Sequence, residues 1–376
     1  MYGEASRAWQ QRLFAPLRVT LFMKIGFVIY GSLDTVSGGY LYDRKLVEYL
    51  RAQGDTVEVI SLPWRKYAAH LMDNFSFRLP PSLDILIQDE LNHPSLIFAN
   101  RGSHPYPVIS LVHHLRCSEL RPKWQNDLYR IVERKYLQIV DGFIFNSKTT
   151  KGVVYGLIGD EKPSIVAYPP TDRFRDLMIP EEKISERASS DELRILFLGN
   201  VIFRKGLHTL LEALNHLGRE NISSYRLDVV GRMNAEPHYA YEMERYILTH
   251  ELSSLVKFHG PLDKEPLVEM YKQAHVMVVP SSYEGFGIIY LEGMGFGLPA
   301  IGTTAGAAGE IITHGKNGYL IQPDNAIILA GHIEELARNR ELLVRLSLNA
   351  VKRYESQPRW DETAERIRGY LKQMLT

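Results

Sequence analysis

Several common features are scarce or missing in this sequence, and each absence narrows the possibilities. The chain of 376 residues contains one cysteine, Cys117, which excludes an internal disulfide framework and any zinc site built on cysteines. We interpret Cys117 as a small buried residue, and a single thiol fits a reducing, cytoplasmic location. Lys plus Arg and Asp plus Glu both total 44, so the chain has no net charge and its charge balance gives no support for a nucleic-acid partner.

Long apolar runs are also missing. No run reaches the roughly 18 residues that a membrane-spanning helix needs. The most apolar early segment is interrupted by Arg18 and Lys24 and lacks a small-residue cleavage site, so no signal peptide is predicted. Met23 begins a segment typical of a natural chain start, and residues 1–22 are therefore interpreted as an N-terminal extension.

Two nucleotide-binding motifs are missing as well. The loop after the first apolar run carries no G-x-G-x-x-G, and the chain contains no G-x-x-x-x-G-K-[ST]. The hypotheses that this chain is a nicotinamide dehydrogenase or a P-loop enzyme therefore lose their main support. Gly293, Gly295 and Gly297 alternate, but within or at the end of a predicted helix, where close helix packing is their best explanation.

What is present is an alternation of short β-rich apolar runs with helical patterns. Near-continuous apolar strands separated by helices indicate parallel sheets covered on both faces. The helical segment 122–140 places Leu128, Val132 and Tyr136 on one face. The predicted strands lie at 24–30, 57–62, 85–88, 107–114, 142–147 and 165–169, and then at 193–200, 225–231, 256–260, 276–281, 299–303 and 318–321.

This pattern predicts an α/β protein with two Rossmann-like, doubly wound domains facing a cleft. A polar segment rich in Pro and charge separates the two series of strands. We expect an N-terminal domain at 23–170, a linker at 171–192, a C-terminal domain at 193–350, and a final helical part at 351–376 that packs back on the N-terminal domain.

The stretch SYEGFGIIYLEGMGFG places two carboxylates among glycines and apolar residues. Because ligands bind beyond the carboxyl ends of parallel strands, this stretch after the run 276–281 is a candidate site. Glu284 is expected in a loop, while Glu292 is expected in a helix whose free N–H groups lie around Gly287 and Ile288. Since carboxylates repel phosphate, both are expected to contact hydroxyl groups. Alternatively, Glu292 only stabilises the helix start and Glu284 is solvated.

Other strand ends carry further candidates. Arg204 and Lys205 follow a strand and precede a helix, which suits a diphosphate, although an ordinary basic turn is the alternative. Gly38 and Gly39 open a helix and allow close approach of a ligand to the backbone. His113, with His114 beside it, ends a strand and can orient a substrate; we identify no spaced partner with which it could hold a metal.

Together these pieces resemble the retaining nucleotide-sugar glycosyltransferases of the GT-B fold, the group called glycosyltransferase family 4 or glycosyl transferases group 1. The central match is E-x7-E from Glu284 to Glu292, with GNVIFRKGLHTLLEAL, VVGR and GEIITHGKNGYLI around it, and SGGY, SLVHH and FNSKTTK earlier. The resemblance covers nearly all of residues 23–376. His114 and Tyr290 depart from it, because many members have Asp and Pro at these positions.

The resemblance implies a metal-independent hexosyltransferase without a cofactor, which uses a UDP- or GDP-sugar as co-substrate. Arg204 and Lys205 are expected to bind the diphosphate, Glu292 the ribose, and Glu284 and His113 the donor sugar. The remaining donor-binding positions implied are Gly38, Gly39, Asn200, Arg232, Gly260, Leu262, Gly287 and Ile288. The acceptor is a glycan, a lipid-linked molecule or a small molecule, as in polysaccharide biosynthesis.

Two other function classes stay open at this point. The same fold can hydrolyse or epimerise a sugar nucleotide, or bind it without turnover. A further question is peripheral membrane contact, because residues 116–138 combine Lys123, Arg130 and Arg134 with Trp124 and are compatible with docking on anionic lipid headgroups. A solvated helix face is the alternative. The oligomeric state is not predicted.

Overall fold

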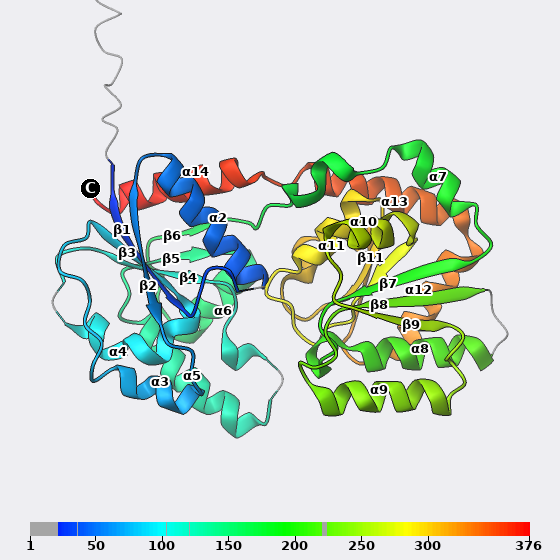
Figure 1. Ribbon diagram of the computed structural model, residues 1–376, viewed down its shortest axis with the longest axis horizontal. Coiled ribbons are helices and arrows are strands. Elements are labelled where there is room, and N and C mark those ends of the chain that lie inside the picture. Colours follow the sequence, from blue (N-terminus) through cyan, green and yellow to red (C-terminus); the bar gives the residue numbers. More distant parts are fainter. Residues whose placement is uncertain (1–21, 36, 103, 120, 220–223) are drawn as a thin grey trace, which may run out of the picture.

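The chain forms two parallel sheets, each with helices on its faces (Figure 1). The computed structural model describes residues 22–35, 37–102, 104–119, 121–219 and 224–376, so residues 1–21 of the expected extension lie outside it. The strand orders are β2-β1-β3-β4-β5-β6 and β12-β11-β10-β7-β8-β9, and every recorded pairing is parallel. Both sheets are therefore doubly wound, as predicted.

The observed strands lie where the apolar runs predicted them. Their bounds are β1 Lys24–Tyr30, β2 Thr56–Leu62, β3 Ile85–Asp89, β4 Val108–Val112, β5 Gly142–Phe145, β6 Ser164–Val166, β7 Leu193–Leu198, β8 Tyr225–Val230, β9 Val256–Gly260, β10 Val276–Val278, β11 Ala300–Thr303 and β12 Gly318–Ile321. Several end two or three residues earlier than predicted, among them β4, β7 and β10.

Helices connect these strands. They are α2 Gly38–Ala52, α3 Tyr67–Asp73, α4 His93–Arg101, α5 Lys123–Leu137, α6 Lys148–Ile158, α7 Glu181–Ala188, α8 Leu207–Arg219, α9 Pro237–Thr249, α10 Lys264–Gln273, α11 Ile288–Gly295, α12 Ala326–Arg338, α13 Arg340–Glu355 and α14 Trp360–Gln373. Short 3-10 turns include η2 Arg116–Ser118, η3 Asp172–Leu177 and η4 Phe203–Lys205. Among the described residues, no helix is both long and apolar enough to cross a bilayer.

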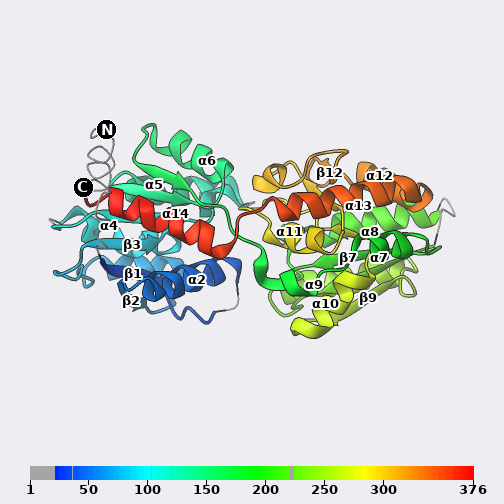
Figure 2. The same cartoon turned by 90° about the horizontal axis from the view of Figure 1, so that it is seen from above.

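The final helix belongs spatially to the N-terminal sheet. The chain crosses back after α13, and α14 packs on α2 and β6 (Figure 2). Arg368 of α14 forms a bidentate pair with the buried Asp55, with contacts of 2.7 and 3.0 Å. At the crossing, the Tyr354 hydroxyl donates to the Thr171 carbonyl oxygen at 2.6 Å. The expected boundary at residue 350 falls inside α13, which ends at Glu355.

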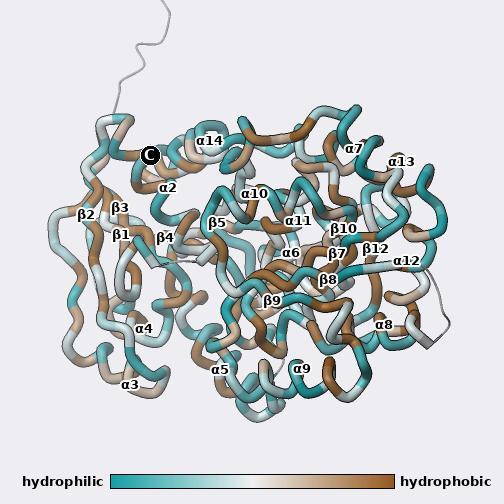
Figure 3. The backbone as a smooth tube through the Cα atoms, turned by 45° about the vertical axis from the view of Figure 1, so that its right-hand side comes forward, coloured by the Kyte–Doolittle hydropathy of each residue, from teal (hydrophilic) through white to brown (hydrophobic). Residues whose placement is uncertain are grey.

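The strands are apolar because they are buried on both faces. Every residue of β3 and β4 is buried, and the centres of both sheets are largely hydrophobic (Figure 3). On the N-terminal sheet, one core cluster joins α2 and α14, and a second joins α4, α5 and α6 on the opposite face. One expectation is wrong: Leu128 of α5 is exposed, whereas Tyr136 and Leu137 are buried.

Candidate active site

The loop after β10 brings the predicted carboxylate and the predicted cations together. Lys205 Nζ donates to Glu284 Oε1 at 2.5 Å, and the Ser281 hydroxyl donates to the same oxygen at 2.7 Å. Lys205 ends the short turn η4, and the chain then passes through Gly206 at φ 74°. A Cβ at Gly206 would lie 2.2 Å from the Pro280 carbonyl oxygen, so only glycine lets η4 approach this loop.

Mutual attraction keeps this buried pair charged. Burial tends to raise the pKa of the Glu284 carboxyl, but the charges of Lys205 and Arg204 outweigh burial and lower it. Burial lowers the pKa of the Lys205 ammonium, and Glu284 partly offsets that effect. Arg204 donates to the Tyr283 carbonyl oxygen at 2.8 Å and lies 3.9 Å from Glu284, so two cations flank one carboxylate.

Glu292 lies on the short helix that follows this loop. Gly287 caps α11 in a left-handed conformation at φ 89°, and Ile288 is the first helical residue. Glu292 is 5 % exposed, accepts a hydrogen bond from the Tyr271 hydroxyl at 3.0 Å and lies 3.5 Å from Arg173 of η3. Burial raises the pKa of Glu292, and Arg173 opposes that effect.

The neighbouring strand ends form a compact backbone surface. Asn200 accepts a hydrogen bond from the Arg232 backbone N–H at 3.4 Å, and the Gly231 N–H donates to the Gly260 carbonyl oxygen at 2.9 Å. A Cβ at Gly231 would lie 1.9 Å from the Gly199 carbonyl oxygen. Leu262 packs partly buried against the C-terminal core.

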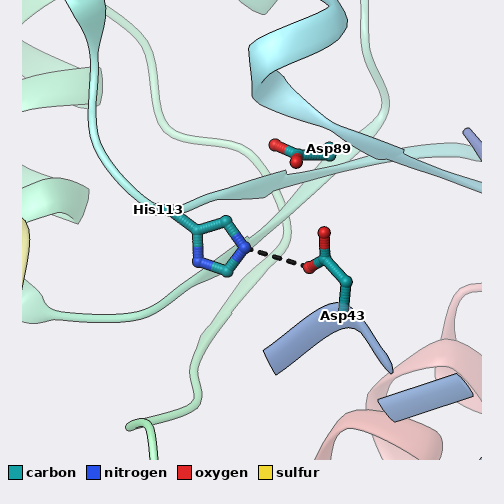
Figure 4. A group of neighbouring side chains, drawn as sticks. All are labelled: Asp43, Asp89 and His113. Carbon is teal, nitrogen blue, oxygen red and sulfur yellow. Dashed lines mark hydrogen bonds and ion pairs between the residues drawn. The ribbon is translucent and has the colours of Figure 1, made fainter. Parts of the chain in front are cut away.

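On the N-terminal side, His113 follows β4 and meets the start of α2. A Cβ at Gly39 would lie 3.2 Å from the His113 ring, whereas Gly38 faces open space. His113 Nε2 lies 3.0 Å from Oδ1 of Asp43, which is fully buried on α2, and Asp89 at the end of β3 completes the group (Figure 4). These side chains come from three separate elements at one sheet edge.

This group contains unusual carboxyls. Burial raises the pKa of Asp43 to about 8, and burial together with Asp43 raises the pKa of Asp89 to about 7. Both carboxyls therefore favour the protonated form up to near neutral pH, and Asp43 Oδ2 is buried without a hydrogen-bond partner in the structure. Burial lowers the pKa of His113, and the imidazole is therefore neutral at pH 7.

The expectation that His113 lacks partners for holding a metal is wrong. Potential ligand atoms of Asp43, Asp89 and His113 all lie within 4.8 Å of one another. Both carboxyls are distant from His113 in the sequence: Asp89 meets it because β3 and β4 are neighbours in the sheet, and Asp43 reaches it from α2. The donor set of two carboxylates and one imidazole is chemically suited to a divalent cation, whereas protonation of the two carboxyls removes their buried charge without one.

The two sides of the junction touch each other. A Cβ at Gly285, directly after Glu284, would lie 2.7 Å from the His113 carbonyl oxygen, so the two predicted catalytic loops are in contact. The Ser147 hydroxyl donates to the Gly285 carbonyl oxygen at 3.2 Å. His114, beside His113, lies 2.9 Å from Glu119. Burial tends to raise the pKa of Glu119, but His114, Arg121 and Arg204 outweigh burial and lower the pKa to about 2.

A second contact between the domains centres on Glu310. Its carboxylate accepts from the backbone N–H groups of Lys148 and Thr149 at 3.0 and 2.7 Å, at the first residues of α6. It also accepts from the Thr149 hydroxyl at 2.6 Å and from the Tyr168 hydroxyl at 3.0 Å. A carboxylate from one domain thus occupies the positive end of a helix dipole in the other.

Comparison with known families adds to this geometry. Residues 178–353 match the family model of glycosyl transferases, group 1. This group 1 region is nearly half of the chain and contains every predicted site residue of the C-terminal sheet. A D-inositol 3-phosphate glycosyltransferase of Xylanimonas cellulosilytica is 29 % identical over 62 % of this chain and 57 % of its own length. The curated relatives that we compared are matched over about half of their length.

Solved structures identify the fold. A sucrose-phosphate synthase from Thermosynechococcus elongatus superposes with a TM-score of 0.77 at 19 % identity, over 93 % of this chain and 98 % of that one. Anabaena HepE, in a complex with UDP and glucose, superposes with a TM-score of 0.70 at 18 % identity, over 93 % and 99 %. The fold of this protein is GT-B, which confirms the predicted fold class.

The structure also reveals polar residues that the sequence had not indicated as functional. Asp43, Asp89, Arg173, Tyr271 and Glu310 all contact a predicted site residue or join the domains. One signal was available for Asp43, which is a charged residue four positions after Gly39 on the buried face of an otherwise amphipathic helix. The others depend on contacts between elements far apart in the sequence.

Proposed function

We propose that this protein is a retaining glycosyltransferase that moves a hexosyl group from a UDP- or GDP-sugar to an acceptor hydroxyl in glycan, glycolipid or glycoside biosynthesis. The observation that carries the proposal is the pair of cations Arg204 and Lys205 around the buried Glu284, whose loop contacts the His113 loop of the other domain. The group 1 match over the same residues supports it. HepE, which shares the fold, binds UDP, and this favours a nucleotide sugar as donor.

The proposed chemistry uses these charges directly. The bond between the anomeric carbon and the diphosphate oxygen breaks with its electron pair going to the diphosphate, where Arg204 and Lys205 stabilise the growing negative charge. The acceptor oxygen bonds to the same face of that carbon, and its proton passes to the leaving phosphate. Glu284 and His113 hold hydroxyls of the donor sugar, Glu292 holds the ribose, and the backbone of Gly39, Gly287 and Ile288 approaches the distal phosphate.

Metal independence is part of the proposal, because Arg204 and Lys205 can supply the positive charge with which a divalent metal would otherwise neutralise a diphosphate. Transfer assays with EDTA and with added Mg²⁺ or Mn²⁺ test it. Unchanged rates support the role of Arg204 and Lys205, whereas loss with EDTA and recovery with metal would assign that role to an ion. The group of Asp43, Asp89 and His113 is then the first place to look for the ion.

The donor is tested by thermal shift against UDP, GDP, ADP and their sugars. A nucleotide sugar that binds only the folded protein raises the apparent melting temperature with the logarithm of its saturation. The preferred sugar is then incubated with and without an acceptor panel. Transfer requires an acceptor and gives an α-linked product from an α-linked donor, while free sugar or an epimer without acceptor indicates hydrolysis or epimerisation. Binding without any turnover indicates a non-catalytic protein.

A further inference from the structure

Large apolar side chains are unusually exposed on one part of the N-terminal domain. They lie before, on and after α3, on α4 and on α5, which pack against one another in the lower part of that domain (Figure 1). Phe75 and Phe98 form a T-shaped pair with ring centroids 5.5 Å apart, so the loop after α3 and helix α4 contribute to one surface. The exposed residues are Trp64, Leu71, Met72, Phe75, Phe98, Trp124, Leu128 and Ile131.

Helix α5 carries the most regular part of this surface. Trp124, Leu128 and Ile131 are 68 %, 51 % and 54 % exposed, and their spacing of four and three residues places them in one row along the helix. The inner face of the same helix is formed by Tyr136, Leu137 and Glu133, which are buried. We call the outer row the α5 stripe; it is available to a partner without any unfolding.

The charges beside the α5 stripe have one predominant sign. Lys123, Arg130 and Arg134 are exposed and form a second row next to it, and Lys135 continues the stripe itself. The acidic Asp127 is paired with Arg130 at 3.1 Å, and Glu133 is buried. An apolar row containing Trp with a basic row beside it complements a layer that has an apolar interior and an anionic surface.

We propose that the α5 stripe docks this protein on an anionic lipid bilayer. The apolar row enters the boundary between headgroups and acyl chains, and the basic row contacts anionic headgroups. Lipid is favoured over a protein partner because the long basic side chains can extend to headgroups while their stems cover the apolar row. A partner protein would instead have to match these flexible charges individually.

The location of α5 links docking to the proposed site. The segment that precedes it contains Glu119, whose carboxylate lies 2.9 Å from His114, the residue beside His113. Docking therefore brings the junction between the domains close to the headgroups. If the proposed transfer reaction is correct, a site in this position favours an acceptor that is held in the same membrane; this step rests on the proposed function. Vesicle binding itself is independent of that reaction.

The test is sedimentation of the full-length protein with vesicles of phosphatidylcholine alone or mixed with phosphatidylglycerol. We expect binding to the anionic vesicles, weakened by salt, and a loss on the order of tenfold or more in the variant Trp124→Ser/Leu128→Ser/Ile131→Ser. The matched control is Ile327→Ser/Ile328→Ser, which removes two exposed isoleucines from α12 of the other domain and should bind as wild type. Because all these residues are exposed, both variants should keep the wild-type melting temperature and nucleotide-induced thermal shift.

Several outcomes would overturn the proposal. They are no binding to either vesicle, equal binding to neutral and anionic vesicles, or equal loss in the control variant. A wild-type dimer in light scattering that becomes monomeric in the stripe variant, without vesicle binding, would assign the surface to a second copy of the chain. If the stripe variant misfolds, Trp124→Phe in folded protein decides: the blue shift of tryptophan emission on anionic vesicles should shrink, whereas an unchanged shift contradicts insertion of α5.

Discussion

The two domains treat buried charge in opposite ways where they meet. On the C-terminal side, Lys205 and Arg204 lower the pKa of Glu284, so the carboxylate stays charged although it is buried. On the N-terminal side, burial raises the pKa of Asp43 to about 8 and, together with Asp43, that of Asp89 to about 7. Two sheets of the same architecture therefore present a charged surface and a nearly neutral one to each other.

This difference teaches that the fold fixes position while neighbouring side chains fix chemistry. Both groups occupy the carboxyl ends of parallel strands, where ligands bind in such sheets. An anionic diphosphate needs the fixed cations of the C-terminal side, whereas neutral hydroxyls are better recognised by the imidazole of His113 and by carboxyls that donate as well as accept. Four substitutions break or sharpen the contrast, in decreasing order of expected effect.

The largest effect is expected for Lys205→Ala. It removes one of the two cations proposed to stabilise the leaving diphosphate and should lower kcat by about 10²- to 10³-fold, comparable to the loss of one oxyanion donor. The measurement is the initial transfer rate at saturating donor, together with the melting temperature. Lys352→Ala, which removes an exposed lysine from α13, is the control and should keep full activity. Near-wild-type turnover in folded Lys205→Ala protein would refute the assigned role.

The next effect is a dependence of stability on pH that distinguishes the two sides. A carboxyl whose pKa is raised by folding binds its proton only in the folded state, so the free energy of unfolding falls as pH rises toward the folded pKa. Between pH 6.5 and 8 this predicts a falling stability, by at most about 1.4 kcal/mol per pH unit for each such group. Histidines whose pKa is lowered by folding oppose this fall near pH 6.5, where the unfolded chain still binds part of their protons, and their effect disappears toward pH 8.

Two variants show which side of the junction causes this fall in the free energy of unfolding. Asp43→Asn cannot ionise and should make the fall between pH 6.5 and 8 shallower, measured by denaturant unfolding at each pH; the part that remains is expected from Glu90, whose pKa burial raises to about 8. Glu284→Gln should leave the slope unchanged, because the pKa of Glu284 is lowered and its contribution is lost only when pH falls below about 4.5. Equal slopes in wild type and Asp43→Asn would show that the carboxyls of Asp43 and Asp89 are not shifted as described.

A moderate effect is expected for Glu310→Ala, which removes the contacts with α6 and Tyr168. Loss of a carboxylate at a helix N-terminus costs about 1 kcal/mol. Since this carboxylate joins the domains, the variant should show a larger radius of gyration in small-angle scattering and a higher KM for donor. Glu341→Ala removes a first-turn carboxylate within a single domain and should leave the radius of gyration unchanged. An equal change in both variants would contradict a role in closure.

The smallest effect is expected for Tyr271→Phe. It removes the hydroxyl that donates to Glu292 but keeps the ring, which stacks on Phe296 with centroids 4.9 Å apart. One lost hydrogen bond of about 1 kcal/mol should weaken nucleotide binding roughly fivefold in calorimetry and leave kcat unchanged. Tyr319→Phe, which loses a similar bond to Glu335 outside the site, should bind nucleotide as wild type.

Much of the fold could be predicted from the sequence because parallel strands are buried on both faces. The runs at 24–30 and 318–321 coincide with β1 and β12 residue for residue. Helix faces were harder to predict. In α5 apolar residues lie on both sides, and periodicity does not say which side faces the core; Leu128 is therefore exposed although Tyr136 is buried.

The candidate site could be predicted where function follows directly from a strand end. Glu284, Lys205 and His113 each stand just after a strand, and the structure joins the first two and places the loop of the third against them. Asp43 and Asp89 could not be predicted as partners of His113, because their proximity depends on the order of strands in the sheet. The roles of all these residues stay predictions until the variants are measured.

The return of α14 to the N-terminal sheet has a consequence for how the chain is made. The buried Asp55 has its ion-pair partner in Arg368, and Tyr42 on α2 stacks edge-on against Trp360. During synthesis on the ribosome, the N-terminal sheet therefore stays without α14 on its face until the whole C-terminal domain has been translated. The N-terminal domain is made first but is completed last. A chain truncated after α13 would contain both domains, with the N-terminal core residues that α14 covers exposed to solvent.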